Sequence, residues 1–431
     1  NKEELWKYTK DIYPIHRSIS GAGVRKTLKY FKRLVPKIKI KSFKSGKKVY
    51  DWTVPKEWSI DEAYIECDKR KIIDFNENNL HILGYSNPIN KTLSYKDLKK
   101  HLYYSKKDPK AIPYRTNYYG DDWGFCVSYD FFRSLNKKKK NKVVIKSKKF
   151  NGVINYGECI IKGKSTREIV LSTNICHPSM GNNETSGAAV TFALSNLLNS
   201  KKNYYTYRIL FLPETIGAIA YINKNFKILK KNVIAGFQII CVGTNKHFSI
   251  VTSPYEDKLC DKIGIFALND LNLKYKKYSY LDRGSDERQF CSPNINLPFC
   301  SIMRSKYGTY KEYHTSSDNL NFISKNGMFS SFEFYKHLIF IIENNFIYKN
   351  LVFGEPFLNK YNLRGSLGGH IDSKFEKNIY DINTKTLLDI LSYMNGRNDL
   401  VEICKLIKVS FEEAVKIVNI LLENTIIKKI K

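Results

Sequence analysis

The sequence has no long uninterrupted run of apolar residues. Its apolar segments, such as Leu338–Ile342, stop far short of the roughly 18 residues that a membrane helix requires. Hydrophobic residues make up 42%, aromatic residues 14% and charged residues 26% of the 431 residues, which is typical of a folded globular chain. The sequence therefore predicts no membrane span and argues against disorder or a coiled coil. At roughly 100 to 200 residues per domain, the length suffices for two or three domains.

Acidic residues are scarce: 41 Asp and Glu stand against 72 Lys and Arg, a formal net charge of +31. Such an excess is compatible with an anionic partner such as nucleic acid, a membrane surface or an acidic glycan. The lysines are scattered, however, and often stand beside Asn and Tyr, as in 137–140 and 274–277. The distribution favours solvated lysines over a dedicated polyanion site.

Paired cysteines are also missing. The nine cysteines are an odd number, no CxxC motif occurs, and they stand within apolar or strand-like segments. This pattern predicts buried thiols in a reducing cytoplasm and argues against a disulfide framework or a structural zinc site.

The chain divides into four stretches of different texture. Residues 1–48 predict helices, 49–148 predict short strands separated by turn residues, 149–352 alternate strand and helix, and 353–431 hold a linker, three short helices and a terminal strand. We therefore expect an α/β fold with a mixed, mostly parallel sheet covered by helices. A β-rich inserted domain and a small C-terminal winged-helix domain complete it. The glycine-rich stretch Leu363–Gly369 is interpreted as the linker.

Polar residues follow two neighbouring strands of the predicted sheet. His177 comes directly after the strand that ends at Ile175, and Glu214 follows the strand Tyr207–Leu212. Because the carboxyl ends of parallel strands meet at one edge of a sheet, these residues suit a metal ligand and a general base. The alternative is structural, since a loop residue and a helix cap would leave the same pattern.

Two more polar turns lie farther along the chain. The turn Gly284–Phe290 holds Asp286 and Glu287, and His314 stands among small polar residues. Only eight histidines occur in the chain. Two of them in polar loops of one α/β domain, with carboxylates on other loops, are an arrangement that zinc binding can use.

Taken in order, these motifs resemble the co-catalytic zinc aminopeptidases, a superfamily that also holds glutaminyl cyclases. The sequence is more closely similar to a bacterial aminopeptidase-like branch associated with polysaccharide biosynthesis, and the resemblance covers essentially the whole chain. The matching segments are Tyr13–Gly21, Asp51–Pro55, Ile175–Ser179, Asp286–Pro293 and Glu312–Thr315.

The resemblance implies roles for single residues. His177 falls on the first metal-binding histidine, His314 on the last, and Glu214 on the general base. Three carboxylates of the family pattern are missing: Asn183 replaces the bridging aspartate, Thr215 replaces the second glutamate, and the strand 237–243 lacks an acid. A site built for a charge of +4 then loses up to three negative charges, so we expect one zinc ion, with none as the alternative.

Three acids remain that could supply compensating metal ligands or catalytic groups: Glu184, Asp286 and Glu287. Under this hypothesis a single Zn²⁺ held by His177, His314 and one carboxylate activates water, Glu214 accepts its proton, and an amide is hydrolysed. The substrate is a peptide N-terminus or an N-acyl amino sugar. Another class of function is a catalytically silent binding or scaffold protein in polysaccharide biosynthesis.

Arg17 is a further candidate at the catalytic site. It is interpreted as a ligand for a substrate carboxylate or phosphate, with a purely structural ion pair as the alternative.

The terminal module is nearly neutral. From Asp381 to Lys431, eight Lys and Arg face seven Asp and Glu, and Glu412 and Glu413 open the expected recognition helix. Phosphate backbones repel such a helix, so we expect no nucleic-acid partner. With no membrane span in the sequence, we expect no membrane partner either. The sequence leaves a homo-oligomer open.

Overall fold

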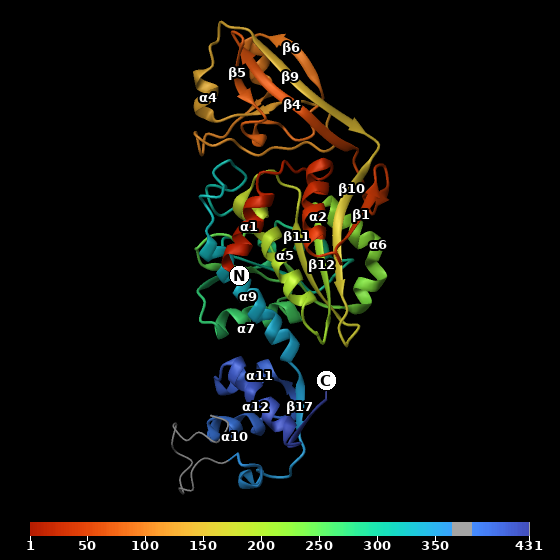
Figure 1. Ribbon diagram of the computed structural model, residues 1–431, viewed down its shortest axis with the longest axis vertical. Helices are drawn as coiled ribbons and strands as arrows, with labels where there is room; N and C mark the ends of the chain where they lie inside the picture. Colours follow the sequence, from red (N-terminus) through yellow and green to blue (C-terminus); the bar gives the residue numbers. More distant parts are fainter. Residues whose placement is uncertain (364–381, 431) are drawn as a thin grey trace. The chain divides into compact units, whose positions relative to one another are not determined.

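The computed structural model describes residues 1–363 and 382–430, and they form two compact units (Figure 1). The first unit comprises residues 1–262 and 274–335, and the second comprises 263–273 and 336–431. The predicted linker, apart from Leu363, lies outside the described residues. Helices α7 (Leu259–Asp270) and α9 (Lys325–Asn344) contain residues of both units.

An eight-stranded sheet forms the centre of the first unit, in the order β1-β10-β12-β11-β13-β16-β14-β15. The pairs β12/β11, β11/β13 and β13/β16 are parallel, whereas β1 and β10 add antiparallel strands at one side. The sheet is thus mixed, as predicted. The strands are β1 (Lys39–Lys44), β10 (Val153–Ile161), β11 (Glu168–Asn174), β12 (Thr206–Leu212), β13 (Val233–Gln238), β14 (Phe248–Val251), β15 (Tyr275–Tyr278) and β16 (Phe299–Met303).

Strands β11 and β12 are buried along their whole length, because helices cover the sheet. Helix α5 (Ser186–Asn199) packs on both strands. Its first turn needs a residue without a side chain, since a Cβ at Gly187 would lie 2.3 Å from the carbonyl oxygen of Ile239. Further helices of this unit are α1 (Lys2–Ile12), α2 (Ala22–Leu34), α6 (Ile216–Asn232) and α8 (Glu287–Phe290).

The inserted region forms a separate antiparallel sheet in the order β5-β4-β9-β6 (Figure 1, orange). Its long strands are β4 (Glu57–Cys67) and β9 (Asn141–Phe150), flanked by β5 (Arg70–Asp74) and β6 (Ile89–Leu93). Short elements complete it: the hairpin β2 (Lys48–Val49) and β3 (Trp52–Thr53), the pair β7 (Leu102–Tyr103) and β8 (Phe125–Cys126), and the helices α3 (Tyr95–Leu98) and α4 (Tyr129–Ser134). This agrees with the predicted β-rich insert.

The second unit has the elements of a winged helix. Its helices are α10 (Thr384–Ser392), α11 (Leu400–Ile407) and α12 (Phe411–Glu423), and its small sheet has the order β18 (Asn395–Asp399), β17 (Ile347–Asn350), β19 (Ile427–Lys429). The side chain of Asp399 caps α11 and that of Ser410 caps α12. The predicted fold class is thus confirmed. Strand β17 belongs to this unit and precedes residue 353, where the sequence placed the boundary.

None of the helices in the described residues combines the length and the apolar character needed to cross a membrane. The nine cysteines are all free thiols, and Cys67 alone among them is not buried.

Candidate functional site

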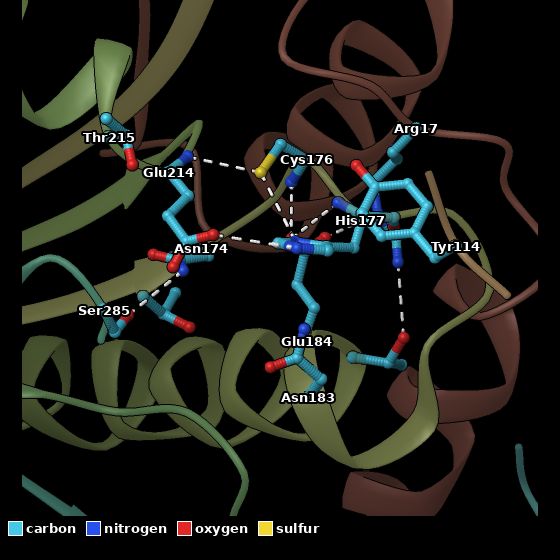
Figure 2. Close-up of polar contacts among 12 residues, drawn as sticks. Arg17, Tyr114, Asn174, Cys176, His177, Asn183, Glu184, Glu214, Thr215 and Ser285 are labelled. Atoms are coloured by element: carbon cyan, nitrogen blue, oxygen red, sulfur yellow. Dashed lines mark hydrogen bonds and ion pairs between the residues drawn. The ribbon is translucent and has the colours of Figure 1, made fainter. Parts of the chain in front are cut away.

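The site lies where the parallel strands β11 and β12 end. His177 follows β11 and Glu214 follows β12, and the side chains of Glu214 and Glu184 are both directed toward His177 (Figure 2). Nε2 of His177 lies 3.7 Å from Oε2 of Glu214. The sheet therefore brings together the two residues that its strand order predicted to meet.

Glu184 holds the imidazole of His177 on its Nδ1 side, opposite the nitrogen that faces Glu214. Nδ1 of His177 lies 2.7 Å from Oε2 of Glu184, and the same oxygen accepts the backbone N–H groups of Cys176 and His177. Burial lowers the pKa of His177, but the hydrogen bond and charge of Glu184 raise it above its ordinary value. An Nδ1–H that donates to a carboxylate leaves Nε2 as the nitrogen that faces the site.

Glu184 is fully buried, and its charge is balanced by Arg17, whose Nε lies 3.1 Å from Oε1. The guanidinium also donates to the carbonyl oxygens of Ile12 and His177 and to the hydroxyl of Thr185. These contacts bear on two predictions. Arg17 is 2% exposed and its guanidinium is bonded within the protein, which favours the structural alternative. Glu184 orients a histidine, and its predicted role as a metal ligand stays a prediction.

Glu214 and Asp286 form a pair of neighbouring carboxyl groups. Burial raises the pKa of Glu214, whose side chain is 23% exposed. Burial, and then the charge of Glu214, raise the pKa of Asp286 well above its usual range. Oδ1 of Asp286 accepts the backbone N–H of Thr215 at 2.8 Å, and Oδ2 is buried with no partner among the described residues. Such a pair favours sharing a proton, which suits proton transfer.

Thr215 stands in the left-handed region, with φ of 62°. Its backbone N–H is directed to Asp286, and its hydroxyl accepts from Arg288 at 2.8 Å. A β-branched residue is strained in this region, so the surrounding contacts hold the turn that presents Glu214.

His314 reaches the same place from a distant loop. Its ring centre lies 5.1 Å from that of His177, and its Nε2 is buried with no hydrogen-bond partner in the part of the chain that the structure describes. Burial lowers the pKa of His314 well below its usual value. A neutral imidazole with an unpartnered nitrogen can accept a ligand.

Asn183 lies buried on the wide helical turn Gly181–Thr185 that leads into α5. Its backbone N–H donates to Asp318, and its side-chain oxygen accepts a weak hydrogen bond from the thiol of Cys241 at 3.6 Å. Burial raises the pKa of Asp318 to about 6. Asn183 thus offers a neutral oxygen at the position where the family pattern has a bridging aspartate.

The carboxylate of Glu287 is bound by four donors of the protein. Its two oxygens accept the backbone N–H groups of Gly284 and Ser285 and the hydroxyls of Tyr307 and Ser301. A buried carboxylate with four donors is engaged within the protein, which argues against its predicted role as a metal ligand. Of the two adjacent acids, Asp286 lies near Glu214 and Glu287 holds the loop.

Sequence reasoning missed Tyr114, which comes from the insert. Its ring centre lies 5.1 Å from that of His177 and 5.3 Å from that of His314, and its backbone N–H donates to the carbonyl oxygen of His314. It also missed Asn174 and Gln238 at the ends of β11 and β13, which are joined by a hydrogen bond of 2.8 Å. No sequence pattern around Tyr114 indicates a site residue. Asn174 and Gln238 could have been predicted, because each is a polar residue at the end of a buried parallel strand.

Two imidazole nitrogens of the site are available as donors to a cation. The unpartnered Nε2 of His314 and the oriented Nε2 of His177 are suitable ligands. Among the described residues, two groups of three His, Cys, Asp or Glu have all their ligand atoms within 4.8 Å: Cys176/His177/Glu184 and Cys260/Asp261/Cys300. Neither contains both His177 and His314. The first is a hydrogen-bonded cluster, since the Nδ1 of His177 already pairs with Glu184.

The order of strands, the helices that cover them and the residues at the strand ends define an aminopeptidase-like α/β domain with a winged-helix unit. Residues 6–345 match a family described as a domain of unknown function (DUF4910), and residues 346–429 match a winged helix-turn-helix family. The chain belongs to the DUF4910 family.

Known proteins show the same two parts. A relative from Clostridium acetobutylicum, provisionally named a polysaccharide biosynthesis protein with aminopeptidase-like domain, is 40% identical over 402 residues, which is 93% of this chain and 90% of the relative. A crystal structure from the same organism, provisionally named a peptidase, has a TM-score of 0.92 and 37% identity and covers 100% of this chain and 96% of that chain. The predicted resemblance is confirmed.

More distant structures share the fold alone. BSAP, a zinc aminopeptidase from Bacillus subtilis, has a TM-score of 0.59 and 15% identity, covering 79% of this chain and 95% of that chain.

Proposed function

We propose that this protein is a hydrolase that cleaves an amide bond with the help of one bound zinc ion. The substrate class is an N-acyl amino sugar, with a peptide N-terminus as the alternative, and the name of the Clostridium relative supports a role in polysaccharide biosynthesis. The observation that carries the proposal is the meeting of three groups: the oriented Nε2 of His177, the carboxyl group of Glu214 and the unpartnered Nε2 of His314.

Each of these residues has a task that follows from its surroundings. His177 and His314 would hold the cation. A zinc ion at this place would polarise the carbonyl group and lower the pKa of a water molecule. Glu214 lies beside His177 and is partly exposed, so it can take a proton from water and return it to the leaving amine.

Asp286 and Tyr114 would support this chemistry. Burial and the charge of Glu214 raise the pKa of Asp286, which favours its neutral form and weakens the repulsion between the two carboxyl groups. Tyr114 covers both histidine rings from the insert and restricts the access of water to them.

A second candidate is a binding protein that has lost catalysis. One observation favours it: in the described part of the chain, no group of three acidic, His or Cys ligands includes both His177 and His314. Asn183 and Thr215, which replace two carboxylates, agree with this alternative.

One variant separates the two candidates. Glu214→Gln removes the proton acceptor and leaves both histidines in place, so turnover of N-acetylglucosamine oligomers and aminoacyl anilides should fall by at least about 100-fold, while bound zinc stays constant. Glu168→Gln is the matched control, because Glu168 is a buried glutamate that pairs with Arg208. If wild-type protein binds these compounds without turning them over, the second candidate function, a binding protein without catalysis, is correct.

A further inference from the structure

Three aromatic side chains of the hairpin β2–β3 and of the loop that contacts it are exposed. Tyr50, Trp52 and Tyr119 are 50%, 40% and 55% exposed. The rings of Trp52 and Tyr119 lie 6.3 Å apart, and the hydroxyl of Tyr119 donates to the carbonyl oxygen of Thr53 at 2.7 Å, which ties the two segments together. We call Tyr50, Trp52 and Tyr119 the aromatic platform.

The backbone at Tyr50 is unusual for a plain turn. Tyr50 stands between β2 and β3 with φ of 53°, in the left-handed region. A tight hairpin turn normally takes Gly, Asn or Asp there, because a bulky residue is strained. The turn nevertheless carries a large exposed ring in a conformation that costs free energy. The adjoining segment Asp51–Pro55 is one of the segments that carry the family resemblance, and none of its residues belongs to the hydrolytic site described above.

One loop, residues 112–119, connects the site to the platform. The loop 112–119 begins beside His314, since the backbone N–H of Ile112 donates to the hydroxyl of Ser316 at 2.9 Å and that of Tyr114 donates to His314. The hydroxyl groups of Tyr114 and Tyr118 lie 3.4 Å apart, and the next residue is Tyr119. Aromatic residues of this loop thus lead from the two imidazoles to the platform.

The chemistry of the platform favours a sugar chain over a protein partner. Sugar rings present flat C–H faces that pack on aromatic rings and hydroxyl edges that bond to polar neighbours. Charged groups follow Tyr119 in the chain: the side chain of Asp121 is 96% exposed, and the Nζ of Lys149 lies 3.9 Å from it. A stable protein interface needs roughly 800 Å² per partner and an apolar core, which three separated rings do not supply.

We propose that the aromatic platform binds saccharide units of a glycan whose N-acyl group reaches Glu214. The inference rests on the proposed function and deepens it, because it selects a sugar chain over a peptide N-terminus as the substrate. Since the hydroxyl of Tyr119 is already bound to the protein, its ring is held in place before the glycan arrives, which favours binding.

The test measures calorimetric binding of N-acetylglucosamine and its longer oligomers to full-length Glu214→Gln protein, which does not consume them. Affinity should increase with oligomer length, and Trp52→Ala should lower the affinity for long oligomers by at least about tenfold while leaving the monosaccharide unaffected. Tyr255→Ala is the control, because Tyr255 is 78% exposed elsewhere in the same unit and should have no effect.

Three results would contradict glycan binding by the platform. The first two are no binding of any oligomer and oligomer binding that Trp52→Ala does not change. The third is a dimer, seen in sedimentation, that Trp52→Ala converts to a monomer. The last would identify the platform as a contact between copies. Failure of hydrolysis is a separate result, since binding to Glu214→Gln protein does not require it.

Discussion

Two buried Arg–Glu clusters in the first unit have the same chemistry and different consequences. In one, Arg208 pairs with Glu168 through two nitrogens, at 2.6 and 2.9 Å, and with Glu158 at 3.0 Å, joining strands β10, β11 and β12. In the other, Arg17 pairs with Glu184, and Glu184 also holds the Nδ1 of His177. The first cluster fixes the sheet, whereas the second fixes the direction of a ring.

The difference lies in what the carboxylate holds besides its arginine. Glu158 accepts the hydroxyl of Tyr221, a residue of α6, so it connects a helix to the sheet. Glu184 accepts three N–H groups of Cys176 and His177 at the end of β11. A buried ion pair therefore has no fixed role, and its remaining hydrogen bonds decide whether it supports the fold or the site.

The largest effect is expected from Arg208→Met. The change leaves Glu158 and Glu168 buried without their arginine, so the first unit should lose about 3–5 kcal/mol of its free energy of unfolding. Urea unfolding followed by tryptophan fluorescence measures this, because all four tryptophans lie in the first unit. Zinc bound per folded chain should not change. If Arg208→Met lowered zinc affinity and left stability unchanged, the assignment of the Arg208 cluster to the fold and of the Arg17 cluster to the site would be wrong.

Glu184→Gln should act on the metal. An amide cannot hold the Nδ1–H of His177 and the backbone N–H groups as the carboxylate does, so zinc affinity should fall about 10- to 100-fold. Competition with a chelator measures it. Glu168→Gln breaks a buried Arg–Glu pair of the other cluster and should lower stability while leaving zinc affinity unchanged. Equal loss of affinity in both variants would show that the effect is general destabilisation.

Asn183→Asp should have a smaller effect. It restores one of three missing carboxylates beside the site, so it should tighten the binding of one zinc ion without creating a stable second site. Elemental analysis of the metal-saturated variant gives the number of ions per chain. Two ions per chain would mean that other groups, of which Asp286 with its unpartnered oxygen is the foremost, complete a second site.

The smallest effect is expected at the surface. Lys325 pairs with Glu3 at 2.7 Å, and both side chains are exposed. Because solvent screens such a pair, Lys325→Ala should produce no measurable change in the urea midpoint or in zinc affinity. A clear shift in the urea midpoint or in zinc affinity would mean that exposed ion pairs also stabilise the protein or its site. Burial would then not decide how much an ion pair contributes.

Much of the fold could be predicted, because buried parallel strands, amphipathic helices and turn residues each leave a local pattern. The positions of His177 and Glu214 followed from the same patterns, since both stand just after buried strands. His314 came from its polar loop and the order of the family motifs.

The roles of Glu184, Arg17 and Glu287 could not be predicted, because they depend on hydrogen bonds between distant residues. Asp286 and Glu287 are neighbours in sequence, yet Asp286 faces Glu214 while Glu287 accepts four donors from its own loop and from Tyr307 and Ser301. Tyr114 pairs with His314 across 200 residues of sequence. The residues around Tyr114 in the sequence do not indicate such a long-range contact.

The central claim is that His177 and His314 together hold one zinc ion. The most direct test is the zinc content, by elemental analysis, of full-length protein purified without a histidine tag, compared with the double variant His177→Ala/His314→Ala. We predict one zinc ion per wild-type chain and none in the double variant, with circular dichroism showing that both are folded. Equal zinc content in the two proteins, or none in the wild type after incubation with zinc, would contradict the claim.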